Sequence, residues 1–91
     1  MRLVWEERAW ADYLHWQKTD TRIVTRINML LRDVTRGIDA ANAHTGIGRP
    51  EALKHGMSGY WSRRITAEHR LIYKVVGDEV RVATCRHHYV I

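Results

Sequence analysis

The 91-residue chain contains one cysteine, one proline, no phenylalanine and no long apolar run. A single cysteine, Cys85, excludes an internal disulfide framework and is typical of a reducing compartment. Cys85 lies in an alternating apolar run, which favours an inert buried thiol over a nucleophile. No stretch approaches the roughly 20 apolar residues of a membrane span, and the early charges argue against a signal peptide. We therefore expect a cytoplasmic protein without a membrane-spanning segment.

Acidic side chains are also scarce, and unevenly so. Residues 1–48 hold seven Lys or Arg against six acids, whereas residues 49–91 hold eight against four. Most of the net charge of +5 therefore belongs to the second half, which favours a polyanionic partner there. Four Trp and four Tyr supply large side chains that each keep a polar atom. The length predicts a single domain over residues 1–91.

Two helices are predicted after a short alternating strand at residues 2–5. The first begins with two glutamates, which suit the positive first turn of a helix, and its stripe consists of Trp10, Tyr13, Leu14 and Gln17. The second is capped by Asp20 or Thr19 and ends at Gly37. Its apolar face consists of Ile23, Val24, Ile27, Leu30, Leu31 and Val34. The short link between the two helices predicts that they form an antiparallel helical hairpin.

The second half predicts strands after a mobile, glycine-containing loop at residues 38–50. Three alternating runs separated by turn residues are Tyr60–Thr66, Arg70–Val76 and Glu79–His88. A tight turn is expected at Gly77-Asp78, and a shorter strand near Ala52–Lys54. Helices followed by strands indicate an α+β fold, in which two N-terminal helices pack on one face of a twisted antiparallel sheet.

Arginines and aromatic residues alternate along the predicted strands. Arg63 and Arg64 lie on opposite faces of one strand, so one is expected to pair with an acid or brace the fold while the other meets a phosphate. Arg70 begins the next strand. A solvated face is the ordinary explanation for such a cluster. Interleaving with Tyr60, Trp61 and Tyr73 favours RNA, whose unpaired bases stack on aromatic and guanidinium planes.

The residue types needed to cleave RNA through its own 2′-hydroxyl occur in the same half. The reaction needs a base, a charge clamp for the phosphorane and an acid for the 5′-oxygen, for which Glu51, Arg70 and His88 are candidates. Alternation predicts that His88 shares a face with Arg86, Thr84, Val82 and Val80. The adjacent His87 and His88 would point to opposite faces, so no metal site is predicted.

Several sequence blocks resemble a known family. They comprise Trp5, Trp10, Asp12-Tyr13, Trp16-Gln17 and Thr19-Asp20, followed by Arg49–His55, Ser58–Ile65, Glu68–Tyr73 and Cys85–Tyr89. In this order they closely resemble the YoeB (Txe) toxins of the RelE-like superfamily. Only the loop at about 37–48 and the final Val90-Ile91 lie outside the resemblance.

The resemblance implies a type II toxin with a microbial-ribonuclease-like fold: an mRNA interferase that cleaves the codon in the ribosomal A site without a metal or cofactor. A YefM-like antitoxin of the Phd type would neutralise it. By resemblance, Glu51 is the general base, His88 the general acid and Arg70 the phosphate clamp, while Tyr89 positions the substrate. The supporting RNA-binding candidates are Lys54, Arg63, Arg64 and Arg86.

Two other functions remain open from the sequence. A non-catalytic module could occupy the ribosome through the basic face alone, which needs arginines and aromatics but neither Glu51 nor His88. A co-repressor acting together with an antitoxin could coexist with the enzyme. The sequence also leaves open whether the chain forms a homodimer.

Overall fold

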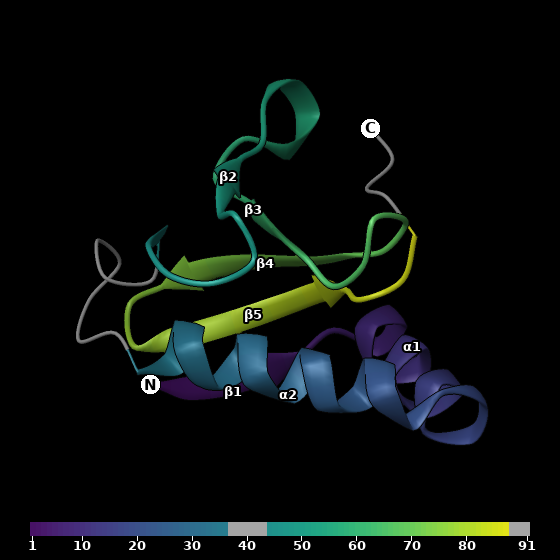
Figure 1. Ribbon diagram of the computed structural model, residues 1–91. Helices are drawn as coiled ribbons and strands as arrows, with labels where there is room; N and C mark the ends of the chain where they lie inside the picture. Colours follow the sequence, from purple (N-terminus) through teal and green to yellow (C-terminus); the bar gives the residue numbers. More distant parts are fainter. Residues whose placement is uncertain (37–43, 88–91) are drawn as a thin grey trace.

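The computed structural model describes residues 1–36 and 44–87, and these form two helices and a five-stranded sheet. In chain order the elements are β1 (Arg2–Trp5), α1 (Glu7–Thr19), α2 (Thr21–Thr35), β2 (Glu51–Ala52), the 3-10 turn η2 (His55–Met57), β3 (Trp61–Arg64), β4 (Arg70–Val76) and β5 (Glu79–Thr84). Figure 1 shows both helices on one face of the sheet. The predicted α+β fold with two N-terminal helices is thus confirmed.

The sheet is mixed, with the strand order β1-β5-β4-β3-β2. Its pairs are antiparallel except that β1 runs parallel to β5, with Arg2 opposite Glu79 and Trp5 opposite Val82. An entirely antiparallel sheet was expected. The first strand instead lies at the edge of the sheet beside the last, and the chain between β1 and β5 includes both helices and the other three strands. Parallel neighbours need such a long crossover connection.

Helix α2 agrees with the sequence prediction. Its buried residues are Ile27, Leu30, Leu31 and Val34. The Asp20 carboxylate accepts from the Arg22 backbone N–H across 3.1 Å, so Asp20 is the cap. The helix ends at Thr35, and the predicted stop at Gly37 lies outside the described residues. Neither helix in the described ranges is long and apolar enough to cross a membrane.

The stripe predicted for α1 is wrong. Its buried residues are Ala9, Asp12 and Trp16, whereas Trp10 is 46% exposed. Trp10 stacks on Tyr13 at the surface, with ring centroids 5.9 Å apart. The buried face includes a carboxylate because Asp12 accepts the Cys85 backbone N–H across 3.1 Å. A polar group that completes a tertiary hydrogen bond cannot be found by counting apolar residues.

The two faces of the sheet are buried by different segments. Toward the helices, Leu71, Tyr73, Val80 and Val82 pack with α1 and α2 in the main core. On the opposite face, Ile72 and Ala83 pack with Leu53 in a smaller cluster beneath the segment between β2 and β3. Figure 1 shows this segment rising from the sheet on the side away from the helices. We call this side the open face.

Two strands are shorter than predicted. Strand β3 ends at Arg64, because the Thr66 hydroxyl accepts from the backbone N–H groups of Glu68 and His69 and thereby closes a turn. Strand β5 ends at Thr84 rather than at His88. Strand β4 has its predicted bounds.

Candidate active site

The strand register places Glu51, Arg64 and Arg70 on the open face. Paired residues in neighbouring strands share a face, and Glu51 stands opposite Ser62, which in turn stands opposite Ile72 of the open-face cluster. Arg64 follows Ser62 by two residues, so it points to the same side and stands opposite Arg70. The structure therefore brings the expected base and the expected clamp to one side of the sheet.

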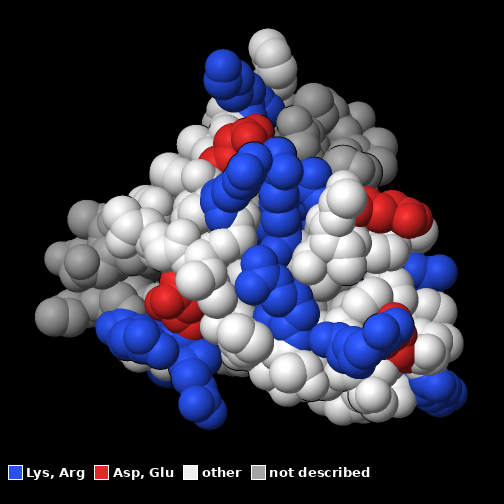
Figure 2. All heavy atoms as spheres, viewed as in Figure 1, with Lys and Arg blue, Asp and Glu red and all other residues white. Residues whose placement is uncertain are grey.

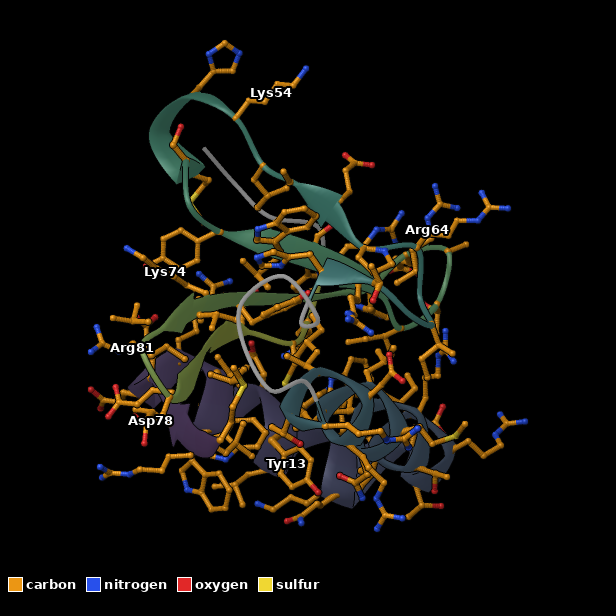
Figure 3. All side chains as sticks on the ribbon, turned by 90° about the vertical axis from the view of Figure 1, so that its left-hand side faces the viewer. Tyr13, Lys54, Arg64, Lys74, Asp78 and Arg81 are labelled. Carbon is orange, nitrogen blue, oxygen red and sulfur yellow. The ribbon has the colours of Figure 1, made fainter. Side chains whose placement is uncertain are left out.

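Two pairs of like charges lie at the two ends of β4 on this face. Arg64 stands opposite Arg70 at the start of the strand, and Lys74 stands opposite Arg81 about 13 Å further along. Figure 3 shows Arg64 on the opposite side of that view from Lys74 and Arg81. The second pair already has partners: Lys74 Nζ lies 5.3 Å from the centre of the Tyr60 ring, and Arg81 binds its neighbour Glu79 across 3.0 Å.

The Arg64–Arg70 end is stiffened by backbone contacts. Arg70 Nη1 donates to the carbonyl oxygens of Thr66, Ala67 and His69 at 2.8 to 3.2 Å. Arg26 of α2 donates from Nη2 to the Arg64 carbonyl across 3.1 Å. Facing guanidinium groups repel each other, so an anion between them is favoured. Figure 2 shows Lys and Arg side chains in a nearly continuous band across the molecule.

Glu51 and Lys54 lie on the exposed segment that begins with β2. Figure 3 shows Lys54 at the far end of that segment, away from the helices. Glu51 and Ala52 pair with β3, so the Glu51 backbone is fixed to the sheet while its carboxylate is open to solvent. A general base must reach the proton that it removes, and an exposed carboxylate is accessible to a substrate hydroxyl.

Arg63 is a correction to the expected RNA-binding set. Its side chain has no exposure, and Nη1 donates to the Asp33 carboxylate across 2.6 Å. Further bonds run from Nε to the Tyr73 hydroxyl (3.1 Å) and from the Nη atoms to the carbonyls of Thr45 and Ile47 (2.9 and 3.0 Å). A buried guanidinium with these partners cannot meet a phosphate in this conformation. Of the two neighbouring arginines, Arg63 braces the fold and Arg64 remains at the surface.

The same contacts correct the expectation of a mobile loop for residues 44–50. Arg63 holds two carbonyls of this segment, and the Arg64 N–H donates to the Gly48 carbonyl across 2.7 Å. The His44 ring stacks on Trp61 with centroids 3.9 Å apart. Gly48 has φ +85°, and a Cβ there would lie 2.7 Å from Leu30 Cδ2, so the close approach requires glycine. Residues 38–43 lie outside the described part of the chain.

Burial and Arg63 set the ionisation of three groups. Burial opposes ionisation of Asp33, but hydrogen bonds from Arg63 and the Ile47 N–H, with the Arg63 charge, lower its pKa below 3.8. Burial and then the Arg63 charge lower the pKa of His44. Burial raises the pKa of Tyr73, against the hydrogen bond from Arg63. Asp33 therefore stays an anion where its buried partner needs one.

The segment after β5 is fixed to α1. The Asp12 carboxylate accepts the Cys85 N–H, and Trp16 Nε1 donates to the Cys85 carbonyl across 2.9 Å. The Cys85 thiol is buried as predicted, and burial with the nearby Asp12 charge raises its pKa to about 12, which disfavours a nucleophilic thiolate. Arg86 places its guanidinium carbon 5.9 Å from the centre of the Trp16 ring.

The expected alternation along β5 is interrupted. Tyr73 stands opposite Val82, but its neighbour Ile72 stands opposite Thr84, so β5 carries one extra residue at Ala83. Val82 therefore faces the helices, and Thr84, which pairs with Ile72 of the open-face cluster, lies on the open face. The prediction that Thr84 continues the face of Val82 is wrong for this reason, and β5 ends before Arg86. His88 and Tyr89 lie outside the described residues, and their predicted roles remain predictions.

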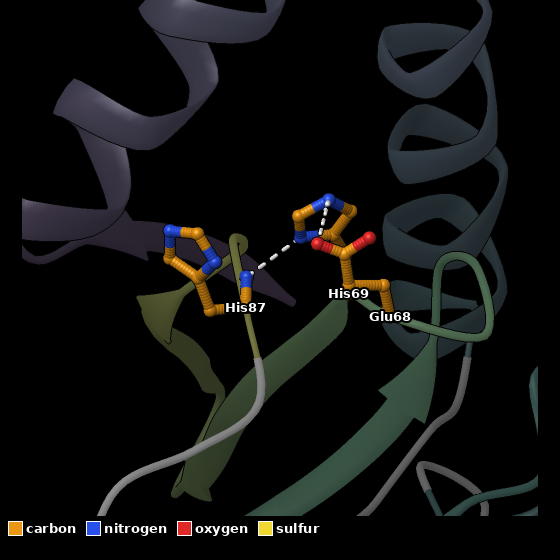
Figure 4. Close-up of side chains that lie close together, drawn as sticks. All are labelled: Glu68, His69 and His87. Carbon is orange, nitrogen blue, oxygen red and sulfur yellow. Dashed lines mark hydrogen bonds and ion pairs between the residues drawn. The ribbon is translucent and has the colours of Figure 1, made fainter.

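A cluster that the sequence did not reveal lies beside this segment. Ligand atoms of Glu68, His69 and His87 lie within 4.8 Å of one another (Figure 4). His69 Nδ1 accepts the His87 backbone N–H across 2.8 Å, and His69 Nε2 lies 3.9 Å from the Glu68 carboxylate. A metal-ligating histidine normally donates from its other ring nitrogen, but Nδ1 is here an acceptor. The arrangement therefore suits a neutral His69 better than a metal ligand.

Comparison with known proteins gives a consistent family match. Residues 5–89 match the model of the YoeB-like toxin of bacterial type II toxin-antitoxin systems. Toxin YoeB of Escherichia coli K12 is 53% identical over 89 residues, covering 98% of this chain and all of that protein. Among solved structures, a YoeB/ParE toxin from Agrobacterium tumefaciens is 49% identical with a TM-score of 0.89, covering 98% of this chain and all of the other.

Two solved structures from Staphylococcus aureus are also similar to this chain. The YoeB dimer is 39% identical with a TM-score of 0.87, and the YoeB-YefM complex is 38% identical with a TM-score of 0.86. Each covers 98% of both chains.

Proposed function

Because this chain belongs to the family of YoeB-like toxins of bacterial type II toxin-antitoxin systems, we propose that it is a ribosome-dependent endoribonuclease. It cleaves mRNA in the ribosomal A site by attack of the RNA 2′-hydroxyl and so inhibits translation. The observation that carries the proposal is the placement of Glu51, Arg64 and Arg70 on one face of the sheet. A carboxylate beside paired guanidiniums suits a reaction that needs a base and an anion clamp.

In this proposal Glu51 removes the proton from the 2′-hydroxyl, whose oxygen attacks the adjacent phosphorus. Arg70 stabilises the phosphorane through the Nε and Nη2 donors that its carbonyl contacts leave for the substrate, and Arg64 adds charge opposite it. His88 protonates the departing 5′-oxygen, and Tyr89 positions the substrate. The products are a 2′,3′-cyclic phosphate and a 5′-hydroxyl. No step requires a metal or a cofactor, and the ribosomal substrate places the reaction in the cytoplasm.

Lys54, Arg64 and Arg86 are proposed to support RNA binding. Lys54 and Arg64 are exposed, and Arg86 is partly exposed on its Trp16 platform. Guanidinium and ammonium groups on a surface contact phosphates without sequence preference. Any preference for a particular codon would then come from the ribosome and from base stacking.

The proposed partner is a YefM-like antitoxin of the Phd type. The S. aureus relative forms a YoeB-YefM complex, and the excess of positive charge in residues 49–91 suits an acidic, unfolded segment. The affinity of this chain for the antitoxin should fall as the salt concentration rises if charges at the rim of their interface contribute. The YoeB dimer from S. aureus supports a homodimer as a second state of this chain. Co-repression together with the antitoxin is compatible with both.

Primer extension on messages bound to translating ribosomes tests the proposed activity. We expect discrete cuts within A-site codons that appear only when ribosomes and the protein are both present. Intact messages carrying stalled ribosomes would instead support the non-catalytic blocker. The comparison uses one protein preparation and separates the two functions without any variant.

A further inference from the structure

His69 fixes the backbone one residue before His88. Its Nδ1 accepts the His87 N–H across 2.8 Å, and the His87 carbonyl accepts the Arg70 N–H across 3.0 Å. Both polar groups of the His87 backbone are thus bound by consecutive residues at the start of β4. Two such bonds determine the position and the direction of the peptide that leads into His88.

The backbone at His87 has an uncommon conformation that needs such support. Its φ is +63°, in the left-handed region that residues other than glycine seldom occupy. A conformation of this kind persists when surrounding contacts over-determine it, and it occurs often at functional sites. Here the contacts come from Arg70, the first residue of β4, and from His69 just before it, and the β4–β5 hairpin separates both from His87 in the sequence.

The His69 ring is itself held in place. Only 12% of its side chain is exposed, and its edge packs on the Trp16 ring with centroids 4.7 Å apart. Trp16 in turn donates to the Cys85 carbonyl, so the same indole supports the chain on both sides of Arg86. Because Nδ1 is an acceptor, the ring proton of neutral His69 belongs on Nε2, which faces Glu68.

We propose that His69 is a positioning residue for catalysis: its Nδ1 holds the His87 N–H and so fixes the backbone immediately before the proposed acid, His88, at the strand that carries Arg70. The inference rests on the proposed ribonuclease function. Arg70 belongs to both parts of the arrangement, since its side chain lies on the open face and its N–H binds His87. Arg70 therefore supplies the proposed phosphate clamp through its side chain and, through its N–H, binds the residue just before the proposed acid His88.

Two variants of similar shape, His69→Asn and His69→Leu, test the role of the hydrogen-bond acceptor at position 69. Asn and Leu have the same branched shape, but only Asn carries an oxygen near the position of Nδ1. We expect His69→Asn to cleave A-site codons within about threefold of the wild-type single-turnover rate and His69→Leu to cleave about 10- to 100-fold more slowly, as small misplacements of catalytic groups do. Ribosome affinity should stay within about twofold for both, because phosphate contacts are unchanged.

A second acceptor-free variant and an amide probe complete the experiment. His69→Phe keeps a ring against Trp16 and should behave like the Leu variant, and circular dichroism identifies which variants are folded at the assay temperature. Hydrogen exchange of the His87 amide, followed by NMR, should remain slow in wild type and the Asn variant and become faster in the acceptor-free variants.

Equal cleavage rates for Asn and a folded acceptor-free variant would overturn the inference, as would a loss confined to ribosome affinity. A wild-type protein that does not cleave at all would refute the proposed function instead. The two failures are therefore distinguishable.

Discussion

The Arg63 guanidinium and the Asp33 carboxylate form a 2.6 Å ion pair that joins β3 to α2, and the arginine is wholly removed from solvent. The pair also binds the chain after the undescribed residues, because the Ile47 N–H donates to Asp33 across 3.1 Å while Arg63 holds the Ile47 carbonyl. Residues 45–47 are thus held to β3 and α2 through one buried ion pair.

Removing either partner of this ion pair should lower the free energy of unfolding. We expect Arg63→Ala to lower the free energy of unfolding by about 3–5 kcal/mol, because Asp33 loses the partner of a buried ion pair. Urea denaturation measures the change. The control is Arg64→Ala on the same strand, where an exposed side chain should change stability by less than about 0.5 kcal/mol. Equal effects at the two positions would contradict the assignment of Arg63 to the core.

The contribution of Asp33 should depend on pH. Its pKa is lowered in the folded protein, so its stabilising effect is present above the unfolded value of 3.8 and is lost as pH falls through the folded pKa. The difference in unfolding free energy between wild type and Asp33→Asn should be largest near neutral pH and shrink below pH about 4. Denaturation of both proteins across that range provides the measurement. A difference that grows on acidification would contradict the sign.

The Cys85 thiol should resist alkylation in the folded protein. Its pKa of about 12 leaves a thiolate fraction roughly 10³-fold smaller than that of an exposed cysteine at neutral pH, and its burial blocks the reagent. Iodoacetamide labelling followed by mass spectrometry should be slow in buffer and fast in denaturant. Rapid labelling of the native protein would show that the segment after β5 opens from α1.

The two like-charge pairs of the open face should differ in function. Arg70→Gln should reduce cleavage by at least about 100-fold, because a clamp on transition-state charge is lost. Lys74→Gln is the matched control at the other end of the same strand, where Tyr60 already contacts the ammonium group, and it should stay within about threefold of wild type. Single-turnover cleavage on programmed ribosomes compares them. Comparable losses would indicate general attraction of RNA rather than a localised clamp.

Periodicity and resemblance predicted much of this fold but not its tertiary hydrogen bonds. The face of α2 and the bounds of β4 followed from local patterns, since each depends on residues within a few positions. The burial of Asp12 depends on a partner 73 positions away, and the parallel pairing of β1 with β5 on the whole intervening chain. No local rule contains such information.

The candidate site was predicted only in part for the same reason: its arrangement depends on contacts between residues far apart in the sequence. Alternation placed Arg63 and Arg64 on opposite faces but could not say which one is buried, because Asp33 is supplied by a distant helix. The extra residue at Ala83 interrupted the face predicted for Thr84 and Arg86. His69 had no signal beyond its place beside Arg70, since its partner is a backbone N–H rather than a side chain.

The most direct test of the account measures A-site cleavage by wild type and by Glu51→Ala, Arg70→Ala and His88→Ala, each shown to be folded. Programmed ribosomes are used with protein previously stripped of metal, and the RNA ends are identified. We expect wild type to leave a 2′,3′-cyclic or 3′-phosphate and a 5′-hydroxyl. Each variant should be slower by about 10²–10⁴, as loss of an acid, a base or a charge clamp requires. Near wild-type rates in all three variants would contradict the account.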